Sequence, residues 1–315
     1  MQFRTTFSIP PQEPKIDHYS EVFLLGSCFV ENIGEKLDYY KLPNLRNPFG
    51  ILYHPAALEN FIDKAVKNLG YSAEDVIQHN ERWHSFEAHS IMSNIDREEL
   101  VKNLNINLTF TREYLEKASH VILTLGTSIG YILQETGYYV ANCHKFPQHR
   151  FHKNMMEIAD IIVCLQNIIS ALQSINPGIA IIFTISPVRH IKDGVVQNQV
   201  SKSRLIEAVS KIVEKFAEVS YFPAYEIVMD ELRDYRFYSE DMLHPNSTAI
   251  EYIWQKFTET WMSKESIPVL KEIGSIQRGL NHRSFNSESE AHQKFLVGLQ
   301  ASIEKLRNKF PHLNF

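Results

Sequence analysis

The sequence is poor in cysteine, and the three that it has do not suggest a disulfide framework. Cys28, Cys143 and Cys164 are an odd number in a chain of 315 residues. A chain of this length buries a core without covalent staples, whereas disulfide-rich scaffolds are short secreted domains. We therefore predict a reducing compartment and a cytoplasmic location.

Long apolar runs and an excess of basic residues are also missing. No window reaches the roughly 18 consecutive apolar residues of a membrane span, and no apolar stretch follows a positive N-terminus as in a signal peptide. Lys and Arg total 32 against 37 Asp and Glu, a net charge of −5, so no basic surface for a phosphate backbone is predicted. We expect no membrane span and no nucleic-acid partner; the 44% of hydrophobic residues predicts a globular protein.

Apolar runs alternate with helical patterns along the chain. Strands are predicted at four runs: residues 21–26, 119–126, 178–186 and 219–227. Helices are predicted at three segments: residues 29–40, 158–172 and 201–217. This order predicts a three-layer α/β/α sandwich with a central, mainly parallel sheet. Ligands of such sheets bind beyond the C-terminal strand ends, so the loops after Gly26, Gly126 and Ser186 are predicted to carry the function.

No repeat or low-complexity linker divides the chain. We predict one domain over residues 1–263, with an inserted segment at 71–96. A helical C-terminal extension is predicted over residues 264–315 and is expected to pack on the same domain.

Gly26-Ser27-Cys28 stands where the first strand turns into a helix. A Ser at this turn projects above the sheet edge, beside the unpaired N–H groups of the helix N-terminus. Such a Ser can act as a nucleophile with oxyanion donors close by. The alternative is that Ser27 only caps the helix, although the Glu or Gln of a capping box is replaced by Val30.

Asp241 and His244 stand three residues apart near the end of the predicted core. Residues at this spacing share one face of a helical turn, so the carboxylate can reach Nδ1 and leave Nε2 free as a base. A serine nucleophile needs such a pair. The alternative is an ordinary exposed turn before a helix whose N-terminus Thr248 and Glu251 could close with a capping box.

Longer blocks around these residues resemble the GSCFA family, a branch of the SGNH (GDSL-like) hydrolase superfamily. They extend over roughly residues 20–260 in family order: GSCFVENIG (26–34), NPFGILYHP (47–55), TLGTS (124–128), NCHKFP (142–147), SPVRHIKDG (186–194), YFPAYEI (221–227) and RDYRFYSEDMLHPN (233–246). The resemblance implies an SGNH/flavodoxin-like fold. It also implies a catalytic triad of Ser27, Asp241 and His244.

The resemblance further implies an oxyanion hole, in which one position departs from the superfamily pattern. The Ser27 N–H and Gly50 match two expected donors. The third is an Asn in a Gly-x-Asn, where this chain has Gly126-Thr127-Ser128. We expect Ser128 or Thr127 to donate instead, or Asn142 to fill in; otherwise the catalyst is feeble, because one lost donor costs about 10²–10³ in rate.

Other polar residues of these blocks are candidates for binding the substrate. Arg189, His190 and Lys145 are suited to a carboxylate or phosphate group, the alternative being solvated loop charges. The full set of predicted substrate-binding residues is Asn47, His89, Thr127, Asn142, His144, Lys145, Arg189 and His190.

The inserted segment at 71–96 carries aromatic and imidazole side chains between two predicted strands. Trp83, His84, Phe86 and His89 are placed to form a wall or lid over the substrate. The alternative is that Trp83 and Phe86 fill a side of the core.

Two other chemistries fit the pattern less well. A papain-type thiolate at Cys28 requires a His at about 158–178, where none stands. His79, His84 and His89 are five residues apart, which puts them off a common helix face and disfavours a metal site.

We therefore predict a serine esterase of the SGNH type that transfers an acyl group to Ser27 and then to water, without metal or organic cofactor. The expected substrate is a small-molecule or carbohydrate ester, and the acyl group stays open. The alternative is a weakly active or non-catalytic member that binds a ligand in the same cleft. The sequence makes no prediction of the oligomeric state.

Overall fold

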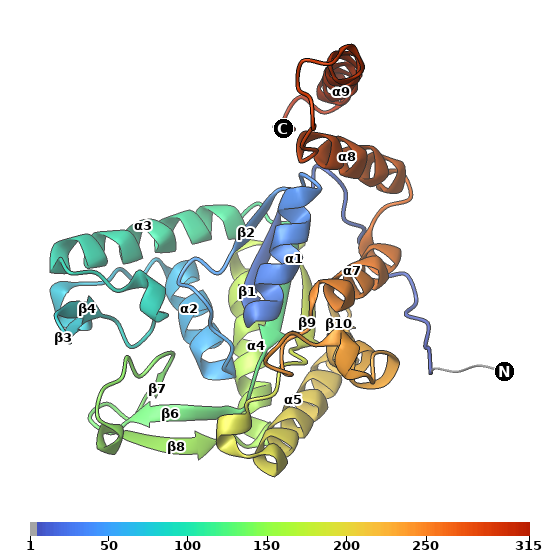
Figure 1. The fold of residues 1–315 in the computed structure, drawn as a ribbon. Helices are drawn as coiled ribbons and strands as arrows, with labels where there is room; N and C mark the ends of the chain where they lie inside the picture. Colours follow the sequence, from blue (N-terminus) through green and yellow to red (C-terminus); the bar gives the residue numbers. More distant parts are fainter. Residues whose placement is uncertain (1–4) are drawn as a thin grey trace.

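The computed structural model describes residues 5–315, and a five-stranded parallel sheet forms its centre (Figure 1). The strand order is β10-β9-β5-β1-β2. The strands are β1 (Val22–Gly26), β2 (Asn44–Arg46), β5 (His120–Leu125), β9 (Ala180–Ile185) and β10 (Val219–Phe222). The order reverses direction at β1, so the loops after β1 and β5 open beside each other at one edge of the sheet.

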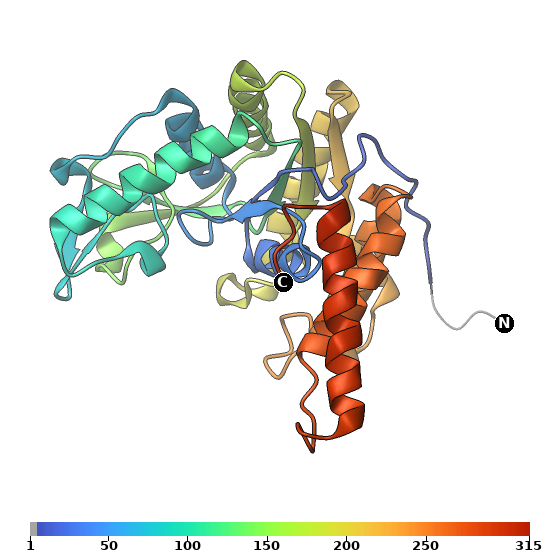
Figure 2. The same ribbon diagram turned by 90° about the horizontal axis from the view of Figure 1, so that it is seen from above.

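Helices cover both faces of the sheet (Figures 1 and 2). One face packs against α2 (Pro55–Lys67), α3 (Arg97–Leu115), α4 (Ile158–Ile175) and α5 (Val195–Lys215). The other face packs against α1 (Cys28–Tyr39) and α7 (Ser247–Trp261). Successive strand side chains alternate between these cores, since Leu25 and Leu123 face the first and Leu24 and Ile122 the second. The predicted three-layer α/β/α sandwich is confirmed.

The helix α4 is long and apolar enough, by length and composition, to cross a membrane. Its buried face, however, packs in the core between α2 and α5. The residues of that face are Ile161, Cys164, Leu165, Ile168, Ile169 and Leu172. Core packing therefore accounts for its apolar character.

The structure corrects several predicted boundaries. The last strand ends at Phe222 rather than at residue 227, because Pro223 has no N–H for the ladder and opens α6 (Ala224–Glu226) and a π-helical turn, η5 (Ile227–Glu231). The helix predicted at 201–217 begins six residues earlier, at Val195.

Two small sheets beside the main one were not predicted. An antiparallel sheet has the order β7-β6-β8, from β6 (Ile129–Leu133), β7 (Tyr139–Val140) and β8 (Phe151–Met155). A hairpin joins β3 (Ile77–His79) and β4 (Arg82–His84). Short 3₁₀ turns lie at Ala73–Asp75, Ser90–Met92, Gln148–Arg150, Ile191–Asp193 and Tyr235–Phe237.

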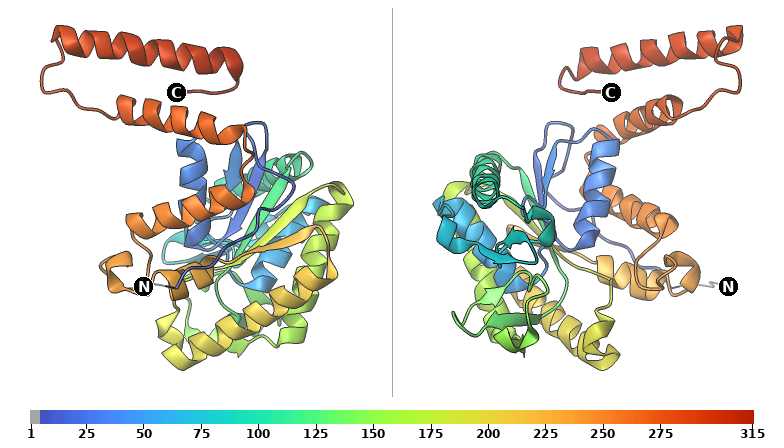
Figure 3. Two further views of the ribbon diagram at one scale, coloured as in Figure 1. Left: turned by 90° about the vertical axis from the view of Figure 1, so that its right-hand side faces the viewer. Right: turned by 60° about the vertical axis from the view of Figure 1, so that its left-hand side comes forward.

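The C-terminal segment forms two helices, α8 (Ser266–Leu280) and α9 (Glu290–Lys309). Figure 3 shows α9 lying outside α8, away from the main sheet. Ile273 and Ile276 of α8 pack with Ile303 and Leu306 of α9 in a core of their own. The chain end returns to the N-terminal region, where His312 Nε2 lies 2.7 Å from the carbonyl oxygen of His18.

Candidate active site

The turn after β1 holds Ser27 at the N-terminus of α1. Gly26 has a φ of +152°, and a Cβ there would lie 2.4 Å from the Thr124 carbonyl oxygen, so the position requires glycine. Ser27 is 4% exposed, and its Oγ accepts a hydrogen bond of 3.3 Å from the Phe29 N–H. It therefore caps the helix, as the alternative interpretation expects, and also lines the cleft described below.

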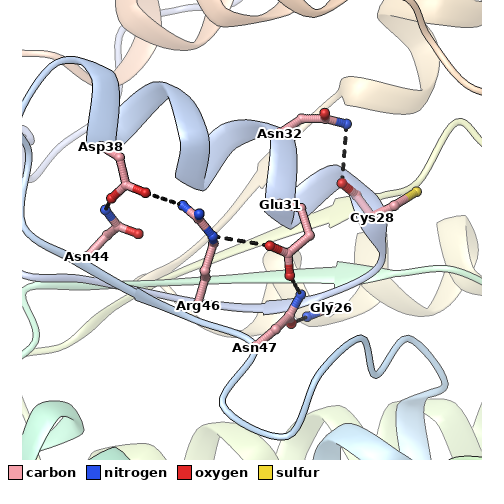
Figure 4. A network of polar contacts seen from close by, with 8 residues as sticks. All are labelled: Gly26, Cys28, Glu31, Asn32, Asp38, Asn44, Arg46 and Asn47. Carbon is pink, nitrogen blue, oxygen red and sulfur yellow. Dashed lines mark hydrogen bonds and ion pairs between the residues drawn. The ribbon is translucent and has the colours of Figure 1, made fainter. Parts of the chain in front are cut away.

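A network of polar contacts lies behind this turn and joins it to α1 and to the end of β2 (Figure 4). The Gly26 N–H donates to Asn47 Oδ1 at 2.9 Å, and Asn47 Nδ2 donates to Glu31 Oε1 at 2.5 Å. Arg46 pairs with Glu31 at 3.1 Å and with Asp38 at 2.6 Å. Asn47 thus supports the nucleophile turn from behind and does not line the cleft. The prediction that it binds the substrate is not supported.

The Asp241–His244 turn is held by hydrogen bonds of its own. Asp241 Oδ1 accepts from the N–H groups of His244 and Leu243, both at 2.9 Å, and His244 Nδ1 lies 2.6 Å from Oδ2. The two backbone donors, followed by the imidazole, lower the pKa of Asp241 to about 2. This geometry favours the tautomer with the proton on Nδ1. Within residues 5–315 no hydrogen bond engages Nε2, which leaves it available as a base.

Ser27 and His244 line one open cleft of about 1500 Å³ that includes its solvent-filled mouth. The loops after β1, β5 and β9 contribute to it, as predicted from the sheet edge. Four predicted binding residues also line it: His89, Thr127, Arg189 and His190. Apolar walls come from side chains that include Ile51, Tyr53, Ile129 and Val140.

Three other predicted binding residues lie away from this cleft. His144 is buried and bonds the Ser85 carbonyl oxygen at 2.7 Å, while burial lowers its pKa to about 4. Asn142 Oδ1 accepts from the His144 N–H, which stabilises the positive φ of 46° there. Lys145 is exposed outside the cleft lining. These residues build the loop after β7, and their expected binding role is not supported.

The expected oxyanion donors are engaged within the protein. The Gly50 N–H donates to the Asn47 carbonyl oxygen at 2.7 Å, and the Ser27 N–H lies 3.3 Å from the Thr124 carbonyl oxygen. Ser128 is fully buried, outside the cleft lining, and its N–H donates to Ser201 Oγ at 2.7 Å. All three predicted donors, Ser27, Gly50 and Ser128, thus have protein acceptors, and their role in an oxyanion hole stays a prediction.

Two other cleft residues offer backbone donors. In the described part of the chain, the N–H groups of Ile51 and Thr127 make no hydrogen bond to protein. They stand one residue after Gly50 and Gly126, in the same two loops from which donors were expected.

The helix α5 contributes three buried polar residues that the sequence reasoning missed. Lys202 Nζ donates to the carbonyl oxygens of Gly126 at 2.5 Å and Ser186 at 2.6 Å. Ser201 holds the Ser128 N–H, and the third residue, Asn198, accepts from the His190 N–H at 2.8 Å.

These three residues tie together the loops after β5 and β9. Burial, reinforced by repulsion from Arg189, lowers the pKa of Lys202 to about 7. Ser201 and Lys202 follow Asn198 by three and four residues, so all three share the face of α5 that packs against the sheet. Polar side chains on a buried face need partners, and this pattern could have identified the three residues from the sequence.

Burial raises the pKa of the Cys28 thiol, which disfavours the thiolate that a cysteine nucleophile needs.

The aromatic side chains of the segment at 71–96 pack against protein. Trp83 packs on the core with Arg97 over its ring at 4.8 Å, and Phe86 packs on Phe146 at 5.2 Å between ring centroids. The histidine of this segment that reaches the cleft is His89.

The other two histidines of that segment bond to protein oxygens. His79 Nε2 lies 3.3 Å from the Lys145 carbonyl oxygen, and His84 Nδ1 lies 2.6 Å from Ser93 Oγ. No group of three metal-binding side chains occurs anywhere in residues 5–315.

The GSCFA family profile matches residues 21–257, and a GSCFA domain protein, C-terminal domain profile matches residues 273–315. No curated protein matches the chain.

Similar solved structures include a carbohydrate esterase family 3 from Talaromyces cellulolyticus, with 12% identity and a TM-score of 0.38, covering 80% of this chain and 99% of that one. An acetyl xylan esterase from the rumen bacterium Butyrivibrio proteoclasticus has 11% identity and a TM-score of 0.39, with 77% and 63% covered. A Clostridium thermocellum family 3 carbohydrate esterase has 12% identity and a TM-score of 0.33, with 81% and 98% covered.

Proposed function

The chain belongs to the GSCFA family, as its blocks predicted, and from this premise we propose that it is a serine hydrolase that cleaves an ester. The observation that carries the proposal is that Ser27 and His244 line one cleft while Asp241 holds the far nitrogen of His244. The residue types and their order along the chain are those of a nucleophile, a base and an orienting acid. The substrate we propose is a small-molecule or carbohydrate ester.

In this mechanism His244 Nε2 takes the Ser27 hydroxyl proton as Oγ attacks the ester carbonyl carbon. The proton then passes to the leaving alcohol, and an acyl group remains on Ser27. Water, activated by the same Nε2, releases the acid. Asp241 stays ionised throughout and keeps the tautomer, which its low pKa supports. We assign the stabilisation of the oxyanion to the free N–H groups of Ile51 and Thr127.

A second candidate function is a ligand-binding protein with feeble or no catalysis. It is favoured by the expected oxyanion donors, because the Gly50 N–H and the Ser128 N–H are occupied by protein acceptors.

The three unpaired cysteines support a reducing compartment under either function.

A fluorophosphonate probe separates these two functions. We expect stoichiometric labelling of the native protein, seen as one mass increment on Ser27, with no label after heat denaturation. His244→Ala and Ser27→Ala should abolish the label. The exposed residues Ser210 and His282 supply matched controls, Ser210→Ala and His282→Ala, which should label as the wild type does.

Turnover of aryl acetates and of longer acyl esters would then identify the acyl preference. Absence of labelling in the native protein, with all acetates left intact, would establish the binding function instead.

A further inference from the structure

The loop that carries Arg189 is held at both ends. Its first residue, Ser186, has its carbonyl oxygen bonded by Lys202. The His190 N–H donates to Asn198, and the His190 ring lies 5.1 Å from that of Tyr53 between centroids. Side chains on such a loop meet a ligand in a preset geometry, at a lower entropy cost than those of a free loop.

Arg189 lines the cleft without a carboxylate partner. Among residues 5–315, its guanidinium has one hydrogen-bond partner, Met229 Sδ at 2.9 Å, which is a weak acceptor. No carboxylate oxygen of the described chain lies within 4.0 Å of it or of Lys192, another cleft residue. Most donors of a half-buried guanidinium are therefore left without a protein acceptor.

The carboxylate that lines the cleft is Asp193, and it pairs with Lys153 at 2.6 Å. Asp241, which lies behind His244, stays ionised and supplies one negative charge. The two cleft cations, Arg189 and Lys192, therefore stand against this single uncompensated carboxylate.

Other titratable groups at or beside the cleft do not supply negative charge. Burial, followed by repulsion from Lys202, lowers the pKa of His190 to about 4, so this imidazole is neutral near pH 7. The raised pKa of Cys28 keeps its thiol neutral, and Lys202 is itself a cation or neutral. The cleft thus carries a surplus of positive charge in a chain whose net charge is −5.

We propose that Arg189, assisted by Lys192, binds an anionic group, a carboxylate or a phosphate, on the ester substrate. The planar guanidinium matches either group with two parallel N–H donors. Lys145, which the sequence offered for this role, lies outside the cleft, so Lys192 takes its place. That the ligand is an ester rests on the proposed hydrolase function, whereas the binding of an anionic group rests on the geometry of the cleft.

Three acetates that share one aromatic ring test the inference: methyl 4-acetoxybenzoate, 4-acetoxybenzoate and 4-acetoxyphenyl phosphate. For the wild type, we expect kcat/KM of at least one anionic acetate to exceed that of the neutral ester about tenfold, mainly through KM. The anionic acetate with the higher kcat/KM shows whether the site prefers a carboxylate or a phosphate. Arg189→Met should remove the preference and Arg189→Lys should keep part of it. Arg233→Met, at an exposed arginine outside the cleft, should leave it unchanged.

A titration without turnover keeps this inference separate from the hydrolase proposal. Binding of 4-hydroxybenzoate and 4-hydroxyphenyl phosphate is measured by calorimetry on wild type and Arg189→Met, with methyl 4-hydroxybenzoate as the neutral control. Missing Ser27 labelling together with Arg189-dependent anion binding would reject the hydrolase and retain the anion site. Equal kcat/KM for the three acetates, or a preference that persists in Arg189→Met, would overturn the anion site.

Discussion

The two turns that carry the proposed catalytic groups are built in opposite ways. The Ser27 turn is buried and held by distant segments, since Gly26 bonds Asn47, 21 residues away, and the Ser27 N–H faces Thr124. The Asp241–His244 turn has side chains that are 46% and 45% exposed, and its bonds join residues at most five apart. The nucleophile therefore depends on the whole fold, whereas the base and its acid depend on a local motif.

Because of this difference, substitutions in the two turns should affect stability and activity to different extents. Changes behind the Ser27 turn remove buried hydrogen bonds and should destabilise the protein, because unpaired buried polar groups are costly. Changes in the exposed turn leave their polar groups to water, so they should affect activity with little effect on folding. Four substitutions test the contrast, from the largest expected effect to the smallest.

Asp241→Asn should reduce kcat about 10³-fold while the free energy of unfolding changes little by comparison. The amide oxygen can still accept the two backbone bonds, but its NH₂ group faces Nδ1 and favours the wrong tautomer. Steady-state kinetics and urea unfolding measure the two quantities. Glu240→Gln, at the exposed neighbour, is the matched control and should leave both unchanged. A large loss of stability in Asp241→Asn would show that the turn is not merely local.

Lys202→Met should lower the free energy of unfolding by about 3 kcal/mol, because the buried carbonyl oxygens of Gly126 and Ser186 lose their donor. The loops after β5 and β9 would then loosen, and Ser27 labelling should slow. Lys211→Met, on the exposed face of the same helix, should cost less than about 0.5 kcal/mol, since its pair with Glu207 is solvated.

The pH dependence of stability gives a second test of Lys202. Its folded pKa of about 7 lies below the ordinary value of 10.5, so between these values the folded state binds fewer protons than the unfolded state. The free energy of unfolding should therefore rise with pH across that window, and this contribution should be absent in Lys202→Met. Identical pH slopes for the two proteins would contradict the buried, uncompensated lysine.

Asn47→Ala should cost about 2 kcal/mol of stability, because the Gly26 N–H loses its acceptor and the Glu31 carboxylate loses one of its two partners. Ser27 labelling should slow, although residue 47 lies outside the cleft. Thermal unfolding and the labelling rate per folded molecule measure the two effects. Unchanged labelling would mean that the turn keeps its shape without Asn47.

Cys28→Ala should change kcat/KM by less than about tenfold, equivalent to about 1.4 kcal/mol, because the thiol is not the nucleophile in this mechanism. The raised pKa of Cys28 supports this small effect. Activity that survives Ser27→Ala and disappears in Cys28→Ala would reassign the nucleophile.

The predicted strands show how far local pattern extends. The runs at 21–26, 119–126 and 178–186 became β1, β5 and β9, because strands buried on both faces are continuous apolar runs. The edge strand β2, with three half-buried residues, has no such run and was missed. The strand predicted at 219–227 was too long because Pro223 ends the ladder.

Among the site residues, the sequence by itself determined the Asp241–His244 pair, because the two residues are three apart in the chain. It also indicated that Ser27 stands at a strand-to-helix junction, although the bonds that hold this turn come from distant segments. The family followed from blocks of the same local kind.

Only the tertiary structure decided which of the other polar residues face the cleft. Asn47 and His144 turned away to bond Gly26 and Ser85, and Ser128 was taken by Ser201, 73 residues further on. Lys202 reached Gly126 across 76 residues. A buried polar group must find a partner wherever the fold supplies one, and that choice depends on contacts between distant segments, which one-dimensional spacing does not contain.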